Sequence, residues 1–381
     1  MRWQSRTLLA TALGPTGGRK RQLAAVAAGL AVVGGLAVAQ GKPDTGGLEV
    51  QPIDVEAQPI TSFDKNDQGR TRYGRLEWRG GLVLSSSSAN FGGWSGLAFD
   101  PGGKRLIAVS DAGAWMTAEL GYDGRRPNAL KSVRIGPLAA RDGRALRQRG
   151  DRDAEALVLA EGSLDKGTLL IAFEGHDRIG RFPAGARGVS APVAYLEIPP
   201  EIHRLGRNGL EALTVLRGGE FKGSVVAVAE QPLPGERDRA GWIWVGGEPK
   251  RFAVEDVGGF DVTDMASLDD GGLLVLERRF NWSEGVKMRL RRVKARALRP
   301  GAVVGGEVLV EADSRHEIDN MEGLAVRQGA GGETLITMIS DDNFNKVLQR
   351  TVLLEFALFG KDTASAATKA HETRSKRASA R

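Results

Sequence analysis

The 381-residue sequence contains no cysteine and only 15 prolines. The absence of cysteine excludes disulfides, thiolate metal sites, a cysteine nucleophile and a lipidated-cysteine anchor. The sequence also lacks a Gly-x-Ser-x-Gly elbow, a Walker loop and a His-Glu-x-x-His motif, which are signatures of serine hydrolases, nucleotide-binding sites and zinc peptidases. Any catalysis must therefore use other side chains.

The one extended apolar run, residues 23–38, is short for a membrane span and consists mainly of Ala, Gly and Val. Arg19, Lys20 and Arg21 precede it, and a small-x-small sequence, residues 37–39, follows. This order is typical of an export signal. We therefore expect residues 1–39 to be a cleaved signal peptide, leaving a periplasmic or secreted protein without a stable membrane span. An uncleaved membrane anchor is the alternative.

Excess positive charge is confined to the two ends of the chain. Residues 1–39 hold five Lys/Arg and no acid, and residues 361–381 hold six Lys/Arg and two acids, so residues 40–360 hold 42 basic and 45 acidic residues. The body therefore lacks the basic excess that binds nucleic acid, and we expect no such partner. Residues 360–381 have almost no large apolar side chains and are predicted to be a disordered basic tail.

Glycine, in contrast, is abundant, with 52 residues, and the sequence contains an internal repeat. Five segments share one sequence pattern, and each is followed by a turn and a second apolar run. The shared segments are residues 94–99, 154–159, 210–215, 263–268 and 321–326. Their second residues are spaced by 60, 56, 53 and 58 positions. Each pair of runs indicates a β-hairpin, and weaker strand candidates follow it. Four antiparallel strands in about fifty residues make up a propeller blade.

The fold class is therefore predicted to be all-β, a five- or six-bladed β-propeller over residues 75–359. Residues 40–74 are expected to be a linker or an extended N-terminal segment. Five blades can be counted, and a sixth would have to be assembled from residues 47–85. Because an open ring would leave unpaired strand edges, we expect an N-terminal strand to pair with the last apolar strand, 347–356, and close the ring.

Acidic residues recur at two places in the repeat. They open the first strand at Glu155, Glu211, Asp264 and Glu322, and close the second at Asp111, Glu174, Glu230, Glu277 and Asp341. In an antiparallel hairpin the start of one strand lies beside the end of the next, so we expect all of these acids at one end of the channel.

Neighbouring carboxylates repel one another unless a cation, a proton or an arginine lies between them. Calcium takes six to eight oxygen ligands, and a ring of carboxylates suits it. We therefore predict a divalent cation, with Ca²⁺ as the expected ion, held by Asp111, Glu155, Glu211, Glu230, Asp264, Glu277, Glu322 and Asp341. The alternative is that these carboxylates accept hydrogen bonds from turn amides or pair with Arg178, Arg278 or Arg279.

Four further residues are candidates for catalysis. Glu174 closes a second strand, and His176 follows it in a position that could face the same mouth. Arg279 and Lys346 come just after second-strand ends, where they would counter the charge of a small anionic substrate. Neutralisation of the acids is the alternative role for both cations.

Several motifs occur in an order that resembles one known family. They are FGGWSGLA at 91–98, SD at 110–111, EAL at 155–157, FE at 173–174, RI at 178–179, GLEAL at 209–213, NMEGL at 320–324 and LITMISDDNF at 335–344. From about Arg72 to Phe359 the chain resembles the phytase-like "esterase-like activity of phytase" family of exported bacterial proteins.

This resemblance implies a propeller whose recurring acids act in phosphoester hydrolysis. The matching acids here are Glu155, Glu174, Glu211, Glu322 and Asp341. Asp264 departs from the pattern by being one carbon shorter, and Ser95 replaces an acid in the first repeat.

The predicted function is an exported metal-dependent hydrolase of a phosphoester. A lactonase or carboxylic-ester hydrolase is a second hypothesis, since a metal in the channel can also catalyse those reactions. A non-catalytic propeller that binds a ligand or partner, with Ca²⁺ for stability, is a third. An enzyme requires open metal coordination with cations opposite the acids, whereas a scaffold would have its acids saturated by arginines.

Overall fold

The computed structural model describes residues 42–206 and 209–359. The predicted signal peptide, residues 1–39, and the predicted tail, residues 360–381, lie outside this part of the chain. In the described part, no helix has the length and apolar character needed to cross a membrane.

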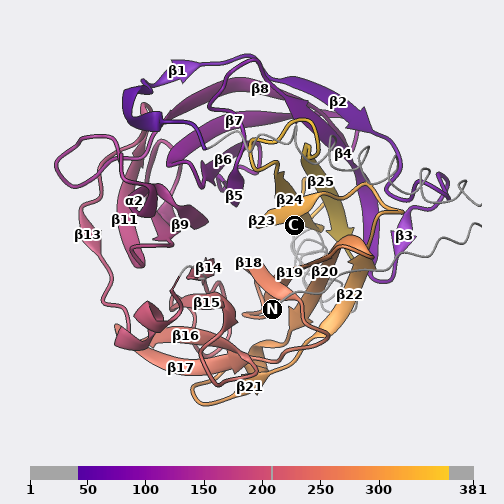
Figure 1. Ribbon diagram of the computed structural model, residues 1–381. Helices are drawn as coiled ribbons and strands as arrows, with labels where there is room; N and C mark the ends of the chain where they lie inside the picture. Colours follow the sequence, from indigo (N-terminus) through magenta and orange to yellow (C-terminus); the bar gives the residue numbers. More distant parts are fainter. Residues whose placement is uncertain (1–41, 207–208, 360–381) are drawn as a thin grey trace, which may run out of the picture. The chain divides into compact units, whose positions relative to one another are not determined.

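Five β-sheets are arranged around a common axis, which makes the fold a five-bladed β-propeller (Figure 1). The innermost strands contact one another in turn around the axis. They are β5 (Trp94–Phe99), β9 (Ala154–Gly162), β14 (Leu210–Val215), β18 (Asp261–Ser267) and β23 (Asn320–Gln328). The all-β propeller predicted from the repeat is confirmed, and the number of blades is five.

In every blade the innermost strand pairs antiparallel with the second strand of the predicted hairpin. These second strands are β6 (Arg105–Ser110), β10 (Lys166–Phe173), β15 (Val225–Pro232), β19 (Leu273–Asn281) and β24 (Thr334–Asp341). The third strands are β7 (Ala114–Asp123), β11 (Arg178–Gly185), β16 (Arg239–Val245), β20 (Gly285–Val293) and β25 (Thr351–Leu358). Further out lie β8 (Arg126–Pro137), β12 (Gly188–Val189), β13 (Ala194–Tyr195), β17 (Glu248–Val254), β21 (Val303–Val304) and β22 (Glu307–Ala312).

Residues 47–85 contribute to the first and fifth blades and do not form a sixth. Strand β1 (Gln51–Pro52) pairs with β8, and β2 (Glu56–Ile60) pairs with β4 (Leu76–Ser85), which also pairs with the short β3 (Arg72–Tyr73). Strand β4 in turn pairs antiparallel with β25, with Leu82 opposite Leu353. The fifth sheet is therefore built from strands near both ends of the described chain.

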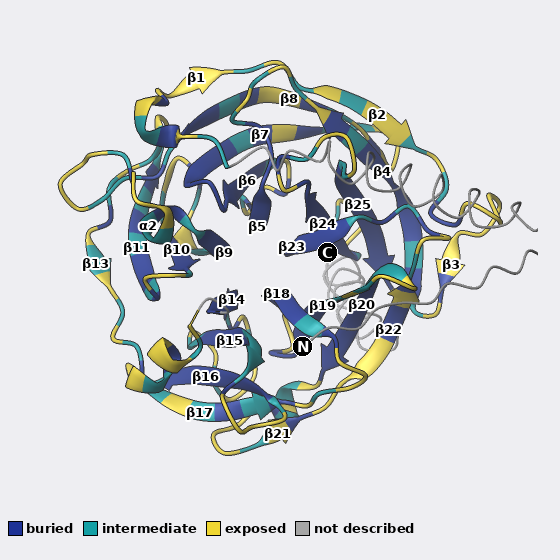
Figure 2. Cartoon of the chain, viewed as in Figure 1, coloured by how far each residue is buried: buried dark blue, intermediate teal, exposed yellow. Residues whose placement is uncertain are grey.

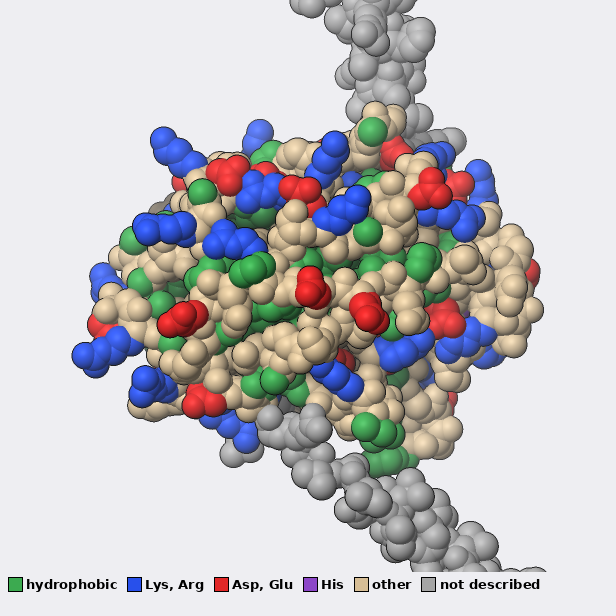
Figure 3. Space-filling view, turned by 90° about the horizontal axis from the view of Figure 1, so that it is seen from above, with side chains coloured by type: hydrophobic (Ala, Val, Ile, Leu, Met, Phe, Trp, Pro, Cys, Tyr) green, Lys and Arg blue, Asp and Glu red, His purple; other side chains and the backbone are tan. Residues whose placement is uncertain are grey.

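The apolar core is divided among the spaces between neighbouring blades. Ala156 of the second blade packs in one cluster with Leu213 of the third, and Leu353 of the fifth blade packs in another with Trp94 of the first. The strands nearest the axis are buried, whereas β2, β13 and β22 at the periphery carry exposed residues (Figure 2). On the face shown in Figure 3, Lys/Arg and Asp/Glu side chains are interspersed.

Candidate functional site

Every innermost strand contains a β-bulge near its start. The ladder to the second strand skips one residue in each blade, and the skipped residues are Ser95, Glu155, Glu211, Thr263 and Glu322. A bulge leaves its extra residue unpaired and re-aims its side chain. The bulge residue of the fourth blade is therefore Thr263. The structural equivalent of Glu155 in this blade is Thr263, one position before the predicted Asp264.

The same register locates the residues that end the second strands. The cross-strand pairs just before the bulges are Trp94↔Ser110, Ala154↔Phe173, Leu210↔Ala229, Val262↔Glu277 and Met321↔Ser340. The residues that come next are Asp111, Glu174, Glu230, Arg278 and Asp341. Four blades thus present an acid here, and the fourth presents Arg278 where the sequence had suggested Glu277.

The two misaligned acids have structural partners. Glu277 is 1% exposed and accepts hydrogen bonds from Arg289 Nε and Arg291 Nε, both at 2.8 Å. Asp264, also 1% exposed, accepts from the backbone amides of Met265 at 2.8 Å and Leu324 at 2.7 Å. Both carboxylates join strands through fixed donors, and their role as metal ligands stays a prediction.

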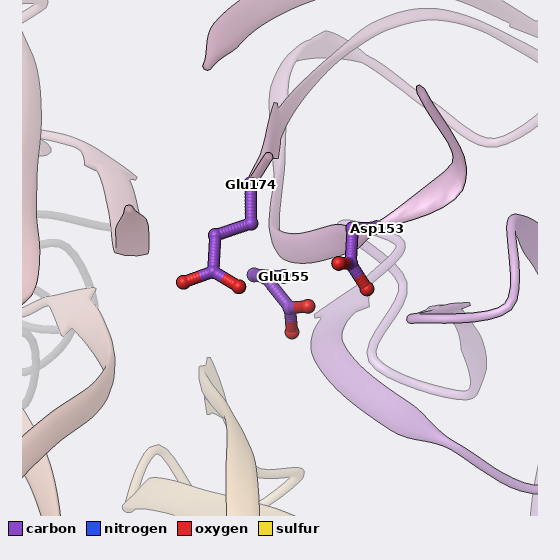
Figure 4. A group of neighbouring side chains, drawn as sticks. All are labelled: Asp153, Glu155 and Glu174. Carbon is purple, nitrogen blue, oxygen red and sulfur yellow. The ribbon is translucent and has the colours of Figure 1, made fainter. Parts of the chain in front are cut away.

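The remaining acids form a carboxylate cluster at one end of the ring. Two groups of three each bring carboxylate oxygens within 4.8 Å of one another, and Glu174 belongs to both: Asp153, Glu155 and Glu174, and Glu174, Glu211 and Glu230. In Figure 4 the carboxylates of the first group face a common space. Asp111, Glu322 and Asp341 complete the cluster, since the charges of Asp111 and Glu322 act on both Glu155 and Asp341.

Two cations enter this cluster. Lys42 Nζ lies 2.6 Å from Asp153 Oδ1 and 3.0 Å from Asp111 Oδ2. Arg278 lies 3.0 Å from Glu322 Oε1 and 3.3 Å from Glu230 Oε1. Pairing with Arg278 was the alternative predicted for the recurring acids. Two acids of the cluster, Glu230 and Glu322, pair with it.

Burial in the cluster favours the protonated form of four carboxyls, those of Asp111, Glu155, Glu174 and Glu211. Burial, with the charges of Asp153 and Glu230, raises the pKa of Glu174 to about 7, although the Gly209 amide donates to its Oε1 at 2.6 Å. Burial likewise raises the pKa of Asp111 to about 6 against the opposing attraction of Lys42. For Glu155 and Glu211, burial followed by neighbouring carboxylates holds the pKa well above the ordinary value. A cation would relieve both effects.

Of the four residues proposed for catalysis, only Glu174 belongs to the cluster. His176 Nδ1 lies 2.7 Å from Asp151 Oδ1, and its side chain is 64% exposed. Arg279 pairs with Glu284 at 2.6 Å. Lys346 donates to the Ser86 carbonyl at 3.0 Å.

Two members of the site were missed from the sequence. Asp153 precedes Glu155 by two positions and comes just before strand β9, so an acid next to the bulge was visible in the sequence. The same relation links Asn320 with Glu322. Lys42 reaches Asp153 from 111 positions away, and nothing in the sequence pattern indicates that contact.

The donor set fits a hard divalent cation. It consists of carboxylate oxygens, the ligands that Ca²⁺ and Mg²⁺ prefer. Asp111 is 6% exposed, and its Oδ1 has no hydrogen-bond partner among residues 42–206 and 209–359. A buried oxygen without a donor is a site at which an ion or a water is expected.

Comparison with known proteins agrees with the motifs. A family model described as "Phytase-like: Esterase-like activity of phytase" matches residues 89–344. This range includes the two innermost strands of every blade and all eight acids of the carboxylate cluster, but not β4, β25 or Lys42. No curated protein matches the chain.

Proposed function

The chain belongs to the phytase-like family named for the esterase-like activity of phytase, and from this membership and the carboxylate cluster we propose that it is an exported, metal-dependent hydrolase of a phosphoester. The resemblance inferred from the ordered motifs is thereby confirmed at the level of the family. The observation that supports the reaction is that Glu174 is shared by two carboxylate triads.

Asp153 and Glu155 on one side, and Glu211 and Glu230 on the other, would hold divalent cations, with Glu174 between them. Bound there, such ions polarise phosphoryl oxygens and lower the pKa of water. Lys42 and Arg278 adjoin the triads, and their positive charges would counter that of the substrate. They replace Arg279 and Lys346, which pair elsewhere, in this role.

Asp177 is the residue that we propose to exchange a proton with the substrate. A Cβ atom placed on Gly209 would lie 2.5 Å from Asp177 Oδ1 and 2.7 Å from Glu174 Cγ, so both side chains border this glycine. Burial raises the pKa of Asp177 to about 6. Its Oδ1 has no hydrogen-bond partner in the described part of the chain, and a carboxyl that titrates near neutral pH is suited to general acid–base catalysis.

The test combines metal analysis with a substrate panel. Purified protein would be titrated with Ca²⁺, Mg²⁺ and Mn²⁺ by calorimetry and assayed on phosphomonoesters, phosphodiesters, lactones and carboxylic esters. Glu174→Gln keeps the shape of the side chain and should lower kcat/KM roughly 100-fold or more. Glu248→Gln, at a position 75% exposed in β17, is the matched control and should leave activity unchanged. A parent protein indifferent to all three ions and to chelator would contradict the metal site.

A non-catalytic, Ca²⁺-stabilised binding module is the second candidate. It is favoured by one observation, that Lys42 and Arg278 already pair with four carboxylates. It predicts that Ca²⁺ raises Tm while no substrate in the panel is hydrolysed. Export, proposed from residues 19–39, would be tested by N-terminal sequencing of envelope material, which should begin at or near Gln40.

A further inference from the structure

A cavity lies between the first and fifth blades, at the other end of the strands from the carboxylate cluster. Strand β23 begins at Asn320, beside the cluster, and ends at Gln328, which lines the cavity. Strand β6 ends at Ser110, next to Asp111, and begins beside Lys104, which also lines it. The cavity volume of about 390 Å³ is in the range of small-molecule sites.

The cavity carries an excess of positive charge. Its lining includes Arg79, Lys104, Arg125 and Arg327 but only two acids, Glu333 and Glu355. Arg327 and Glu355 pair with each other, and Tyr122 donates to Glu355 Oε2 at 2.8 Å. Arg79, Lys104 and Arg125 are left to face the cavity with the single carboxylate of Glu333, which accepts a hydrogen bond from Arg125 Nη2 at 3.1 Å.

Arg79 is the buried cation of this group. Its side chain is 5% exposed, and its Nε and Nη2 have no hydrogen-bond partner among the described residues. Nη2 lies 3.2 Å from Glu77 Oε2 and 3.6 Å from Glu333 Oε1 without hydrogen-bond geometry. Burial and the adjacent charge of Arg125 lower the pKa of Arg79. A buried guanidinium with unfilled donors calls for a ligand.

The neighbouring lining leaves room for such a ligand. Gly102, Gly103, Gly124 and Gly329 surround the charged groups together with Ala330 and Leu335. A Cβ atom on Gly124 would contact nothing within 4 Å. The site therefore offers cations at one place and small or apolar surface around them.

We propose that this cavity binds a small organic dianion, a phosphate monoester or a dicarboxylate, whose anionic oxygens are held by Arg79 and Arg125. The planar guanidinium groups match the paired oxygens of either anion. The site is separate from the carboxylate cluster and does not depend on the hydrolase proposed above.

The probes are inorganic phosphate, ribose 5-phosphate and succinate, measured by calorimetry and thermal unfolding at fixed ionic strength. Chelator is present throughout, so that a metal in the carboxylate cluster does not contribute. We expect at least one probe to bind and to raise Tm by mass action. Preference for the phosphates or for succinate identifies which of the two sources supplies the oxyanion. Binding of none of the three overturns the proposal.

Variants place the binding in the cavity. Arg79→Met should weaken binding at least tenfold, and Arg125→Gln, at a position 64% exposed, at least threefold without risk to folding. Arg144→Gln, at a position 87% exposed elsewhere on the surface, is the matched control. Glu174→Gln should bind the probes as the parent does. Equal losses in Arg144→Gln and Arg125→Gln, or a loss confined to Glu174→Gln, would contradict this location.

Discussion

Eight carboxylates and two cations share one end of the ring, and Lys42 is the cation that comes from outside the repeat. Its burial opposes the charged form, yet Asp111 and Asp153 raise the pKa of Lys42 above its ordinary value. A lysine ammonium is a compact point charge. Lys42 therefore stands where a metal ion would otherwise neutralise the same two acids.

Replacing this lysine should have opposite effects with and without metal. In chelator, Lys42→Met leaves the buried Asp111 and the partly buried Asp153 without their cation. The substitution should lower the free energy of unfolding by about 2 kcal/mol, less than for a fully buried pair. With Ca²⁺, the variant should gain more in Tm than the parent, because the added negative charge attracts the ion. Lys250→Met, whose partner Glu248 is exposed, is the control. A smaller Ca²⁺ response in Lys42→Met would show that the lysine supports the metal site.

The raised pKa values predict how stability changes with pH. Glu174 at about 7 and Asp111 at about 6 lie above their ordinary values of 4.5 and 3.8, so the folded protein binds more protons than the unfolded chain in that window. The free energy of unfolding should therefore fall as pH rises from about 4 to about 7. Thermal unfolding of the metal-free protein checks this, and Glu174→Gln should flatten the slope.

Metal affinity should follow the reverse trend, since a cation displaces these protons. Calorimetry between pH 5.5 and 8 should show tighter Ca²⁺ binding as pH rises, by up to about tenfold per pH unit for each displaced proton. Affinity independent of pH would mean that the cluster is already ionised.

At the scale of the strand, the bulge decides which acids meet. The hairpins could be predicted because apolar runs and turns repeat along the chain, and so could Glu155, Glu211 and Glu322, which are the bulge residues themselves. In the fourth blade Asp264 follows the bulge residue Thr263, and similarity alone aligns acid with acid. Sequence comparison does not reveal which residue a ladder skips, because that depends on pairing with the neighbouring strand.

The fourth blade offers a test that separates structure from metal binding. Glu277→Gln would leave Arg289 and Arg291 buried with one charged partner fewer, and should lower the free energy of unfolding by about 3–5 kcal/mol. The increase in Tm caused by Ca²⁺ should stay as in the parent. Chemical denaturation with and without Ca²⁺ measures both quantities. If a folded variant lost the increase in Tm caused by Ca²⁺, Glu277 would be a metal ligand after all.

At the scale of the whole molecule, stability depends on cores shared between blades. Each blade is a thin sheet that buries its faces only against its neighbours, including the fifth blade against the first. The repeat predicted such a ring but did not decide whether it has five or six blades. The sequence pattern could not decide, because Pro52 and Pro59 weaken the strand signal of β1 and β2, and because only the partners of β1, β2 and β4 assign them to existing blades.

Removal of strand β25 should unfold the ring rather than trim it. All eight of its residues are buried, and it lies between β24 and β4. Its large apolar side chains, Val352, Leu353, Leu354, Phe356 and Leu358, each contribute about 1.5–3 kcal/mol, a sum comparable with the 5–15 kcal/mol that typically separates folded from unfolded protein. The deletion would also expose the edges of β24 and β4.

A chain ending at Arg350 should therefore show no cooperative thermal transition by calorimetry or circular dichroism. A chain ending at Phe359 is the matched control, since it keeps every described strand, and it should melt as the parent does. If the chain ending at Arg350 melted cooperatively at the parental Tm, the pairing of β25 with β4 would not hold the ring together. The first and fifth blades would then have to be joined by their apolar faces alone, through contacts such as that of Trp94 with the fifth blade.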